Sequence, residues 1–383
     1  MSMFTVFIPC PRGLENVLAD EMAALGITEV KPYDGGVGGS ASPEQVAEAN
    51  LWLRTATRVT VVLNEGECNH IKQLYDMAFQ VRWDDWFQCS QTFRVDANVD
   101  KRCGESREFV NLKVKDAVVD RFRQARGERP SIDKRDPHAR VRVHWVDGYA
   151  RIMLDTSGEP LFKRGWRGGT GEAPLRENLA AGLLLLAGYD GSTPFFDPMC
   201  GSGTLLVEAA DIAANLPPGR YRQFAYKRLL PLQDVRVQRY ESRPIEQLIT
   251  GNDRDSHVIR HARQNLRNAD YDDIVLTSME LSDLDAPANS GILVTNPPYG
   301  ERLEDLQTIS RSYPAWGTWL KQKMPGWQTF WLTADRAMPK GMGLSPKRKT
   351  PLFNGALECR LFSIPMVSGS ARGQSARESM RPE

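Results

Sequence analysis

The stretch Asp197–Thr204, with the sequence Asp-Pro-Met-Cys-Gly-Ser-Gly-Thr, decides the fold of this 383-residue chain. The apolar runs on either side of it predict a short buried strand at 194–197 and a helix at 204–214. Glycines at a strand–turn–helix junction let the backbone approach a ligand closely. The turn has neither the Gly-Lys-Ser/Thr ending of a phosphate-binding loop nor the dinucleotide fingerprint. It therefore binds another kind of ligand, or it is an ordinary connection between a strand and a helix.

Strand and helix patterns alternate on both sides of this turn. The predicted strands lie at 248–252, 274–277, 291–295 and 329–332, and the predicted helices at 175–187, 256–269 and 314–324. Asn354-Gly355 indicates a hairpin between strands at 349–353 and 356–364. This alternation is typical of a parallel α/β sheet covered by helices.

Two carboxylates indicate what the glycine turn binds. Asp197 ends the strand before the glycines, which suits a ligand with an amino group better than a pyrophosphate. Asp253 follows the next strand and is placed to bind a ribose diol. Together they describe a site for S-adenosylmethionine. The residues assigned to the cofactor here are Asp197, Pro198, Cys200, Gly201, Gly203, Thr204 and Asp253. Cys200 has no histidine nearby in sequence, so we interpret it as a packing residue and not as a nucleophile.

The second motif, Asn296–Tyr299, has the sequence Asn-Pro-Pro-Tyr and lies at the carboxyl end of a predicted strand, the edge where open parallel sheets bind ligands. The Asn296 side-chain oxygen and the Pro297 carbonyl can accept the N–H groups of a planar exocyclic amine, which orients the nitrogen lone pair toward a methyl donor. Pro297 and Pro298 fix the backbone in advance, and Tyr299 can stack on the base. The motif predicts methyl transfer to an amino group, with these four residues as catalytic and Asn296 also beside the cofactor.

The first half of the chain predicts a mixed α and β region. Strands are expected at 4–9, 57–63 and 92–99, helices at 12–25, 43–53 and 108–124, and a turn in the glycine run 35–39. Asp147-Gly148 marks a hairpin that places Arg140, Arg142 and His144 on one sheet face. That face is either solvated or an RNA platform. The glycine-rich passage 163–169 reads as a linker and a domain boundary.

The net charge of +1 averages over a mosaic. Residues 1–100 carry 7 Lys/Arg and 14 Asp/Glu, a net of −7. Residues 101–142 carry 13 and 7, residues 215–245 carry 7 and 2, and residues 336–383 carry 9 and 3, giving nets of +6, +5 and +6. Three basic islands are suited to polyanion binding, although charge runs are also common on solvated faces.

Composition excludes several protein classes. A hydrophobic content of 41% with 25% charged residues is that of a globular chain, and no apolar run reaches the ~18–20 residues of a membrane span. The six cysteines form no Cys-x-x-Cys pair, which argues against a zinc site or a disulfide framework, so no metal is expected and the expected location is cytoplasmic.

The two motifs match the class I S-adenosylmethionine-dependent amino-methyltransferases. More narrowly, residues 1–365 resemble the bacterial 23S rRNA guanine-N2 methyltransferase family that carries an N-terminal THUMP domain. The segments that carry this resemblance are 12–15 with 25–26, 111–117, 164–167, 173–177, 296–302 and 354–360. The resemblance implies a Rossmann-like class I methyltransferase sheet with an N-terminal α+β ferredoxin-like and THUMP region. The implied domains are 1–55 (ferredoxin-like), 56–165 (THUMP), 166–367 (methyltransferase) and 368–383 (a disordered tail).

The family further implies methylation of the exocyclic N2 of a guanine in 23S rRNA, on naked rRNA or a ribosomal precursor particle. The alternatives are an N6-adenine-specific DNA methyltransferase, a tRNA guanine-N2 methyltransferase, and a non-catalytic RNA-binding assembly factor. Where relatives use Asp after the third strand to bind the adenine amino group, the best candidate here is Glu280. The basic segment 215–245 is expected to be an insertion near the active-site rim, holding RNA or forming a lid, with a solvated loop as the alternative. The expected RNA ligands are Lys113, Lys115, Arg121, Arg123, Arg140, Arg142, Arg164 and Arg167. The modified nucleotide and the oligomeric state do not follow from the sequence.

Overall fold

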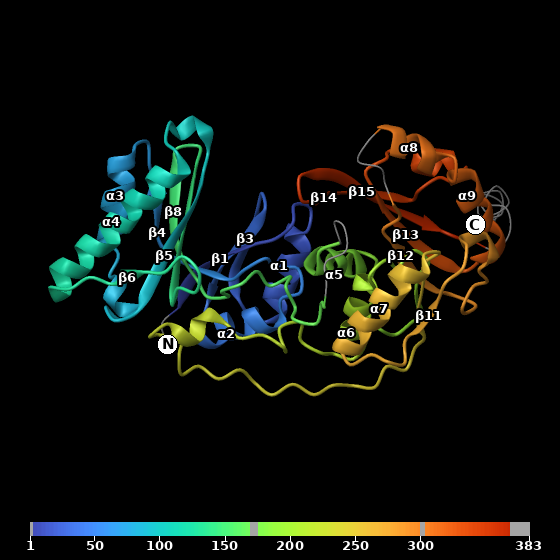
Figure 1. Ribbon diagram of the computed structural model, residues 1–383, viewed down its shortest axis with the longest axis horizontal. Coiled ribbons are helices and arrows are strands. Elements are labelled where there is room, and N and C mark those ends of the chain that lie inside the picture. Colours follow the sequence, from blue (N-terminus) through green and yellow to red (C-terminus); the bar gives the residue numbers. More distant parts are fainter. Residues whose placement is uncertain (1–2, 169–174, 299–302, 368–383) are drawn as a thin grey trace, which may run out of the picture. The chain divides into compact units, whose positions relative to one another are not determined.

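The structure is a computed structural model that describes residues 3–168, 175–298 and 303–367 (Figure 1). The chain forms two compact units. The first contains residues 3–10, Leu18–Lys163 and Gly219–Arg239. The second contains Pro11–Val17, Arg164–Pro218 and the described residues from Tyr240 onward. The division after Lys163 falls in the glycine-rich passage that the sequence marks as a boundary.

The first unit is built on an eight-stranded sheet with the order β2-β3-β1-β4-β8-β7-β5-β6. Neighbouring strands are antiparallel except β5, which runs parallel to both β6 and β7. The strands are β1 (Phe4–Pro9), β2 (Thr28–Tyr33), β3 (Gly36–Ala41), β4 (Thr60–Glu67), β5 (Thr92–Val99), β6 (Ser131–Ile132), β7 (Ala139–Val146) and β8 (Tyr149–Asp155).

The described α-helices that accompany this sheet are α1 (Glu15–Ala24), which belongs to this unit from Leu18 onward, α2 (Pro43–Trp52), α3 (Ile71–Gln80) and α4 (Arg107–Arg126). Ser42 begins α2 as predicted, because its hydroxyl accepts from the Gln45 amide and the Gln45 side chain returns a bond to the Ser42 amide. The hairpin of β7 and β8 is also confirmed. Asp147 and Gly148 both have positive φ, 53° and 72°, as a type I′ turn requires.

The glycine run at 35–39 is not a turn, and that prediction is wrong. Gly35 turns the chain, but Gly36 begins β3, which pairs with both β1 and β2. A Cβ on Gly36 would lie 2.7 Å from the Phe7 ring, and one on Gly39 would lie 2.9 Å from the Ile27 side chain. These glycines therefore let neighbouring side chains lie directly on the strand. The prediction considered only the tendency of glycine to form turns.

The second unit is built on a seven-stranded sheet with the order β11-β10-β9-β12-β13-β15-β14. The first five strands in this order are parallel, and β15 runs antiparallel to both β13 and β14. The strands are β9 (Phe195–Asp197), β10 (Ile249–Asn252), β11 (Val275–Thr277), β12 (Gly291–Thr295), β13 (Trp327–Thr333), β14 (Arg348–Asn354) and β15 (Leu357–Pro365). The order reverses between β9 and β12, because β10 and β11 lie on one side of β9 and β12 lies on the other. Such a switch point opens a crevice at the carboxyl ends of the strands.

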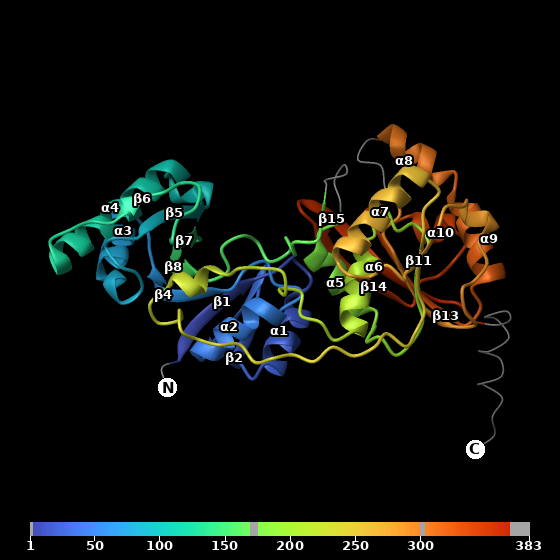
Figure 2. The same ribbon diagram turned by 60° about the horizontal axis from the view of Figure 1, so that its bottom comes forward.

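The described helices of this unit are α5 (Glu177–Leu186), α6 (Thr204–Ala213), α7 (Ser256–Asn268), α8 (Leu303–Ser310), α9 (Tyr313–Lys323) and α10 (Met338–Gly341). Helix α6 packs against both α5 and α7 (Figure 1, Figure 2). An aromatic cluster joins α9 to the sheet, with Trp316, Trp319, Trp327 and Trp331 all buried.

The basic segment 215–245 divides between the two units. Its central part, Gly219–Arg239, belongs to the first unit, where the Tyr226 amide donates to Thr156 O and the Leu230 amide donates to Trp86 O. Arg228 binds Asp136 at 3.0 Å, so part of its positive charge is neutralised within that unit. These residues return to the first unit before the chain continues into β10. That they form an insertion at the active-site rim stays a prediction.

None of the described helices combines the length and the apolar content that a membrane crossing requires.

Candidate active site

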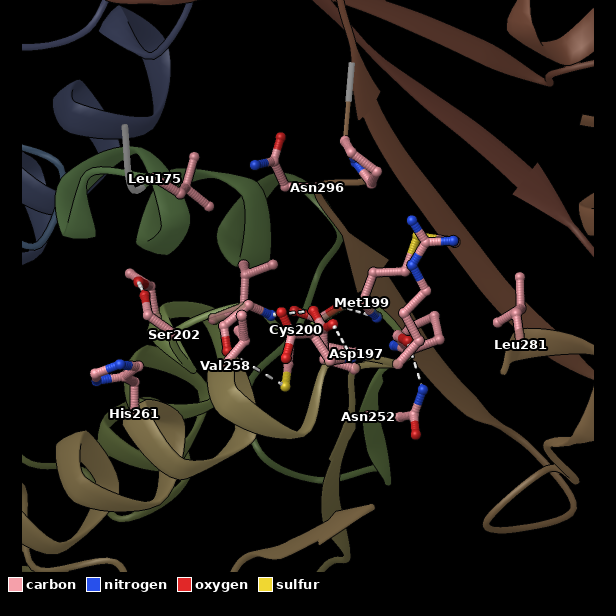
Figure 3. A pocket seen from close by; sticks show the side chains of 18 of the residues that line it. Leu175, Asp197, Met199, Cys200, Ser202, Asn252, Val258, His261, Leu281 and Asn296 are labelled. Carbon is pink, nitrogen blue, oxygen red and sulfur yellow. Dashed lines mark hydrogen bonds between the residues drawn. The ribbon is translucent and has the colours of Figure 1, made fainter. Parts of the chain in front are cut away.

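A cavity of about 960 Å³ opens at the carboxyl ends of the parallel strands in the second unit (Figure 3). We call it the sheet-edge cavity. Both sequence motifs contribute to it. The predicted site residues among its lining are Asp197, Pro198, Cys200, Gly201, Thr204, Asp253, Glu280, Asn296 and Pro298. Residues between 194 and 298 that are far apart in the chain meet here, because β9, β10, β11 and β12 all end at the same edge.

The glycine turn after β9 takes a conformation that only glycine adopts easily. Gly201 and Gly203 have φ of +53° and +81°, and Gly203 is the residue before the first turn of α6. The Gly201 amide donates to Asp253 Oδ2 at 3.1 Å, and the Cys200 amide donates to Asn252 O at 2.7 Å. The turn is thus tied to the end of β10. Gly203 is not among the residues that line the cavity, and its part is to shape the turn.

Asp197 is almost completely buried, with 1% of its surface exposed. Burial raises the pKa of its carboxyl group to about 7, and hydrogen bonds from Thr295 Oγ1 (2.8 Å) and the Met199 amide (3.1 Å) act in the opposite direction. None of the described groups that shift its pKa is a cation. An acid in this environment is suited to a cationic ligand, which would stabilise the charged form.

Asn252, at the end of β10, links the segments around the cavity through its side chain, although neither sequence motif includes it. Its amide nitrogen donates to Pro198 O and Met279 O, at 3.1 and 3.0 Å. Its side-chain oxygen accepts from Thr277 Oγ1 and the Met279 amide, at 2.9 and 3.0 Å. Asn252 therefore ties the glycine turn to the segment after β11, where Glu280 has an exposed side chain. Only its place directly before Asp253 could have drawn attention to it.

Asn296 follows β12 directly, and its side-chain oxygen is buried without a hydrogen-bond partner among the described residues. Thr295, the residue before it, is the donor to Asp197, so the two motifs are joined through one hydrogen bond. Pro297 is buried and Pro298 is exposed at the cavity. The predicted stacking residue Tyr299 lies outside the described residues. A buried acceptor without a donor is unfavourable unless a ligand supplies one.

The cavity also has an apolar wall that the sequence motifs do not indicate. Leu281, Ile309 and Trp316 contribute to it. Trp316 stacks on Trp331 at a centroid distance of 5.8 Å, which fixes the orientation of its ring. Trp166 directly precedes Arg167 in the chain. Unlike Trp316, it is buried and does not line the cavity.

Arg164 and Arg167 were predicted as RNA ligands, but both side chains point into their own unit. Arg164 is 2% exposed and binds Glu208 of α6 at 3.0 Å, so the prediction is wrong for Arg164. Such a buried pair serves packing and not solvent-side recognition. Arg167 binds Glu177 at 2.8 Å and two hydroxyls of the glycine turn, those of Ser202 and Thr204.

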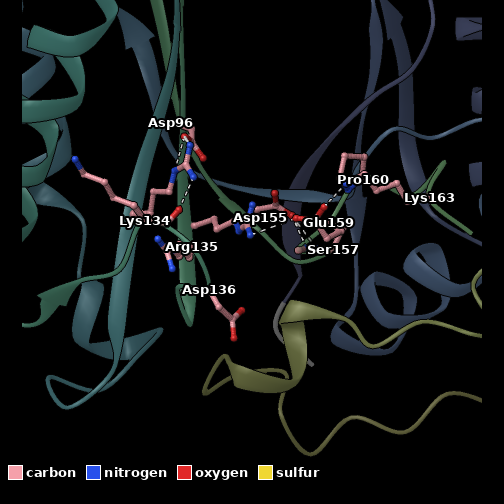
Figure 4. A network of polar contacts seen from close by, with 12 residues as sticks. Asp96, Lys134, Arg135, Asp136, Asp155, Ser157, Glu159, Pro160 and Lys163 are labelled. Atoms are coloured by element: carbon pink, nitrogen blue, oxygen red, sulfur yellow. Dashed lines mark hydrogen bonds and ion pairs between the residues drawn. The ribbon is translucent and has the colours of Figure 1, made fainter. Parts of the chain in front are cut away.

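Arg140 and Arg142 belong to a polar network inside the first unit, in which Asp155 and Glu159 accept from arginines (Figure 4). Its centre is Asp155, a fully buried carboxylate that accepts from Arg58 at 2.7 Å and from Arg142 at 3.1 Å. Arg140 binds Glu159 at 3.4 Å. The sheet face is therefore neither fully solvated nor a row of unpaired cations, and a role of these two arginines in RNA binding stays a prediction.

A groove of about 640 Å³ runs beside α4 in the same unit, and we call it the α4 groove. Lys113, Lys115 and Arg123 line it together with Arg129, whereas Arg121 does not. Two carboxylates, Asp116 and Asp120, share the groove and pair with Lys115 (2.6 Å) and Arg123 (3.3 Å). Three of the four predicted cations of α4 are thus gathered in one concave surface.

Among the residues that the structure describes, no group of three or more histidine, cysteine or acidic side chains is placed to hold a metal ion.

The strand order, the glycine turn after β9 and the Asn-Pro-Pro segment after β12 are those of the class I methyltransferase fold. Residues 164–363 match the family model of the RMKL-like methyltransferase domain, and the chain belongs to this family. Residues 5–60 match the RlmL ferredoxin-like domain and residues 68–155 match the THUMP domain.

Curated relatives include the ribosomal RNA large subunit methyltransferase K/L of Marinomonas sp. strain MWYL1, which is 33% identical over 99% of this chain and 55% of the relative. The protein of the same name from Shewanella amazonensis is 36% identical over 97% of this chain and 54% of the relative. The chain spans about half the length of these curated relatives.

Solved structures of similar proteins cover nearly the whole chain. SMU.472, a protein classed as a methyltransferase and solved in complex with SAH, has a TM-score of 0.86 and 29% identity, covering 97% of this chain and all of the other. A protein from Listeria monocytogenes described as a predicted N6-adenine-specific DNA methylase has a TM-score of 0.83 and 28% identity, covering 96% and 97%. TrmN from Thermus thermophilus, at 20% identity and a TM-score of 0.72, supports the fold alone.

Proposed function

We propose that the chain transfers a methyl group from S-adenosylmethionine to the exocyclic N2 of a guanine in 23S rRNA. The observation that carries this proposal is the buried side-chain oxygen of Asn296 in the sheet-edge cavity, which has no hydrogen-bond partner in the described part of the chain. It is an acceptor without a donor among the described residues, and it lies at the strand end next to a site for a cationic ligand. An amino group on a flat base supplies the missing donor.

The cavity residues fit S-adenosylmethionine in chemical type. Asp197 is a buried acid with a raised pKa, which suits the ammonium group of the methionine part. Asp253 and Glu280 are acceptors placed at the ends of the next two strands, and they suit the ribose hydroxyls and the adenine amino group. Once bound, this cofactor supplies a methyl group on a sulfonium, which is a good leaving group.

The residues of the chain then act by positioning. Asn296 Oδ1 and the Pro297 carbonyl hold the N–H groups of the target amine, and this directs the nitrogen lone pair toward the methyl donor. The hydrogen bond from Thr295 to Asp197 keeps the amine site and the cofactor site at a fixed distance. Trp316 offers the flat apolar surface that an extruded base needs, since a base inside folded RNA must leave its stack to react.

The RNA itself is proposed to dock on the first unit through the α4 groove, where Lys113, Lys115 and Arg123 lie together. Phosphate contacts of this kind position an RNA without reading its sequence. The choice of guanine N2 in 23S rRNA follows from the family resemblance, and the curated relatives are named as methyltransferases of large-subunit ribosomal RNA.

The rival target is the N6 amine of adenine in DNA, since an Asn-Pro-Pro-Tyr segment accepts that amine equally well and one solved relative carries that description. Methyl transfer from labelled S-adenosylmethionine to 23S rRNA, tRNA and duplex DNA separates these possibilities. The proposal expects label in guanine of 23S rRNA. Label confined to adenine of DNA, or to tRNA, would refute it.

A further inference from the structure

We propose that Arg167 is a positioning residue for the carboxylate of the methionine part of S-adenosylmethionine, acting through the hydroxyls of Ser202 and Thr204. This inference rests on the proposed function, because it concerns the same cavity. It reassigns an arginine that the sequence presents as part of a basic, glycine-rich linker. The observations that carry it are the hydrogen bonds of a single guanidinium group.

The Arg167 guanidinium is held on one edge and donates from the other. Its Nε donates to Glu177 Oε1 at 2.8 Å, and Glu177 is itself 4% exposed. The Nη1 group donates to Ser202 Oγ at 3.1 Å, and the Nη2 group donates to Thr204 Oγ1 at 2.8 Å. The Nη2 group also donates to Leu175 O at 3.4 Å, and the Cζ atom lies 5.2 Å from the centroid of the Trp166 ring. Arg167 therefore has one defined orientation, with two of its nitrogens on the glycine turn.

These bonds determine what the two hydroxyls can do next. A guanidinium has donors and no acceptor, so Ser202 Oγ and Thr204 Oγ1 both accept from Arg167 and both keep their own hydrogen. The two oxygens lie 3.4 Å apart, so at most one hydrogen is used between them. At least one hydroxyl hydrogen is therefore left without an acceptor among the described residues, and a third partner can accept it. Both residues line the sheet-edge cavity, and a donor polarised by a neighbouring cation is a stronger donor.

The charges around the two hydroxyls indicate that the third partner is an anion. Acidic side chains, Asp253 and Glu280, line the part of the cavity that follows β10 and β11, and they suit hydroxyl and amino groups. Ser202 and Thr204 instead lie at the beginning of α6, a ten-residue helix whose first residues have no side-chain cap. The positive end of that helix dipole acts in the same direction as Arg167. In S-adenosylmethionine the group with this charge is the carboxylate, next to the ammonium group assigned to Asp197.

A second set of bonds fixes Arg167 in place. Asn265 of α7 donates to Ser202 O at 2.9 Å and accepts from the Gly168 amide at 3.2 Å. Asn268 donates to Trp166 O at 2.9 Å. The residues on both sides of Arg167 are therefore tied to α7, which also contacts the turn. This arrangement is rigid enough to orient hydroxyl groups, as a positioning residue requires.

The test compares two ligands that differ only in the carboxylate. Titration calorimetry would measure the Kd of the full chain for S-adenosylmethionine and for decarboxylated S-adenosylmethionine. The variants are Arg167→Lys, which keeps the charge but cannot reach all four acceptors of the guanidinium, and Ser202→Ala, which removes one of the two hydroxyls. Arg267→Lys is the matched control, because Arg267 is an exposed arginine of the same unit paired with Asp272.

We expect Arg167→Lys to weaken S-adenosylmethionine binding about tenfold or more, and Ser202→Ala to weaken it severalfold. Both should change the Kd of the decarboxylated ligand less than about twofold, and Arg267→Lys should change neither Kd. Equal losses for the two ligands would overturn the inference, because they would reveal a purely structural role. Unchanged binding of both ligands in a folded Arg167→Lys protein would overturn it too.

The outcomes also separate this inference from the proposed function. If the wild-type chain binds neither ligand, the proposed function fails and the inference fails with it. If the wild-type chain binds both and the variants do not discriminate between them, only the role of Arg167 is wrong. Should Arg167→Lys not fold, as denaturant unfolding would reveal, the Ser202→Ala result alone decides.

Discussion

Replacing Asp197 by Asn should stabilise the ligand-free protein above pH 7 and abolish cofactor binding. The Asp197 carboxyl is 1% exposed and its pKa is raised from the ordinary value of 3.8 to about 7. The folded protein therefore keeps this proton to a higher pH than the unfolded chain does. The stability that comes from the protonated form is lost as the pH rises through 7. Asn keeps the acceptor for Thr295 and the Met199 amide and carries no charge.

The magnitude follows from the size of the shift. Each unit of pKa difference corresponds to ~1.4 kcal/mol, so the full range from 3.8 to about 7 corresponds to roughly 4 kcal/mol. Between pH 7 and pH 5 the folded wild type binds a proton at Asp197 that the unfolded chain does not bind, so its stability rises by ~1.4 kcal/mol for each of these two pH units. The advantage of Asp197→Asn in the free energy of unfolding should therefore shrink by about 3 kcal/mol over that interval.

Thermal unfolding of the full chain from pH 5 to pH 8 measures this difference, following the transition that belongs to the second unit. About 3 kcal/mol corresponds to roughly 6–12 °C in a unit of this size. Asp272→Asn is the control, because that side chain is 71% exposed and should leave the pH dependence unchanged. Parallel pH profiles for the wild type and Asp197→Asn would refute the argument that burial raises the pKa of this acid.

Four other outcomes are expected. Asn296→Ala should reduce methyl transfer by about 100-fold or more while the Kd for S-adenosylhomocysteine, measured by calorimetry, changes less than about twofold; normal turnover would contradict the role of Asn296. Affinity of the wild type for S-adenosylmethionine should fall about tenfold per unit as the pH drops below 7, because Asp197 must lose its proton to pair with the ammonium group, and a flat profile would contradict this. Gly203→Ala, at φ +81°, should destabilise the protein by about 1 kcal/mol or more in denaturant titrations and weaken cofactor binding, whereas the control Gly188→Ala, at φ +74° and outside the cavity, should only destabilise it. Lys113→Ala combined with Lys115→Ala should lower the salt dependence of RNA binding by about two phosphate contacts, unlike the exposed control Lys72→Ala, and equal slopes would argue against the α4 groove.

The sequence is most informative where one short pattern determines one local structure. The strand Gly291–Thr295 lies as predicted, and so does the hairpin turn at Asp147-Gly148. The carboxyl ends of the predicted strands also meet at one cavity, because the carboxyl ends of parallel strands lie at the same edge of a sheet. For this reason Asp197, Asp253 and Asn296 could be grouped before any coordinates.

The same approach fails where a residue serves a distant part of the chain. The glycines of β3 read as a turn, but neighbouring side chains require their missing Cβ atoms. The sequence presents Arg164 and Arg167 as cations of a linker. In the structure Arg164 forms an ion pair with Glu208 and Arg167 forms one with Glu177. Spacing along the chain carries no information about such partners, and a charge count cannot distinguish a buried ion pair from a surface that binds RNA.

The most direct measurement of the central claim is nucleoside mass spectrometry of 23S rRNA after incubation with the protein and S-adenosylmethionine carrying a deuterated methyl group. The account predicts labelled N2-methylguanosine with the wild type and none with Asn296→Ala. Label in N6-methyladenosine, or in N2-methylguanosine to the same extent with both proteins, would contradict it.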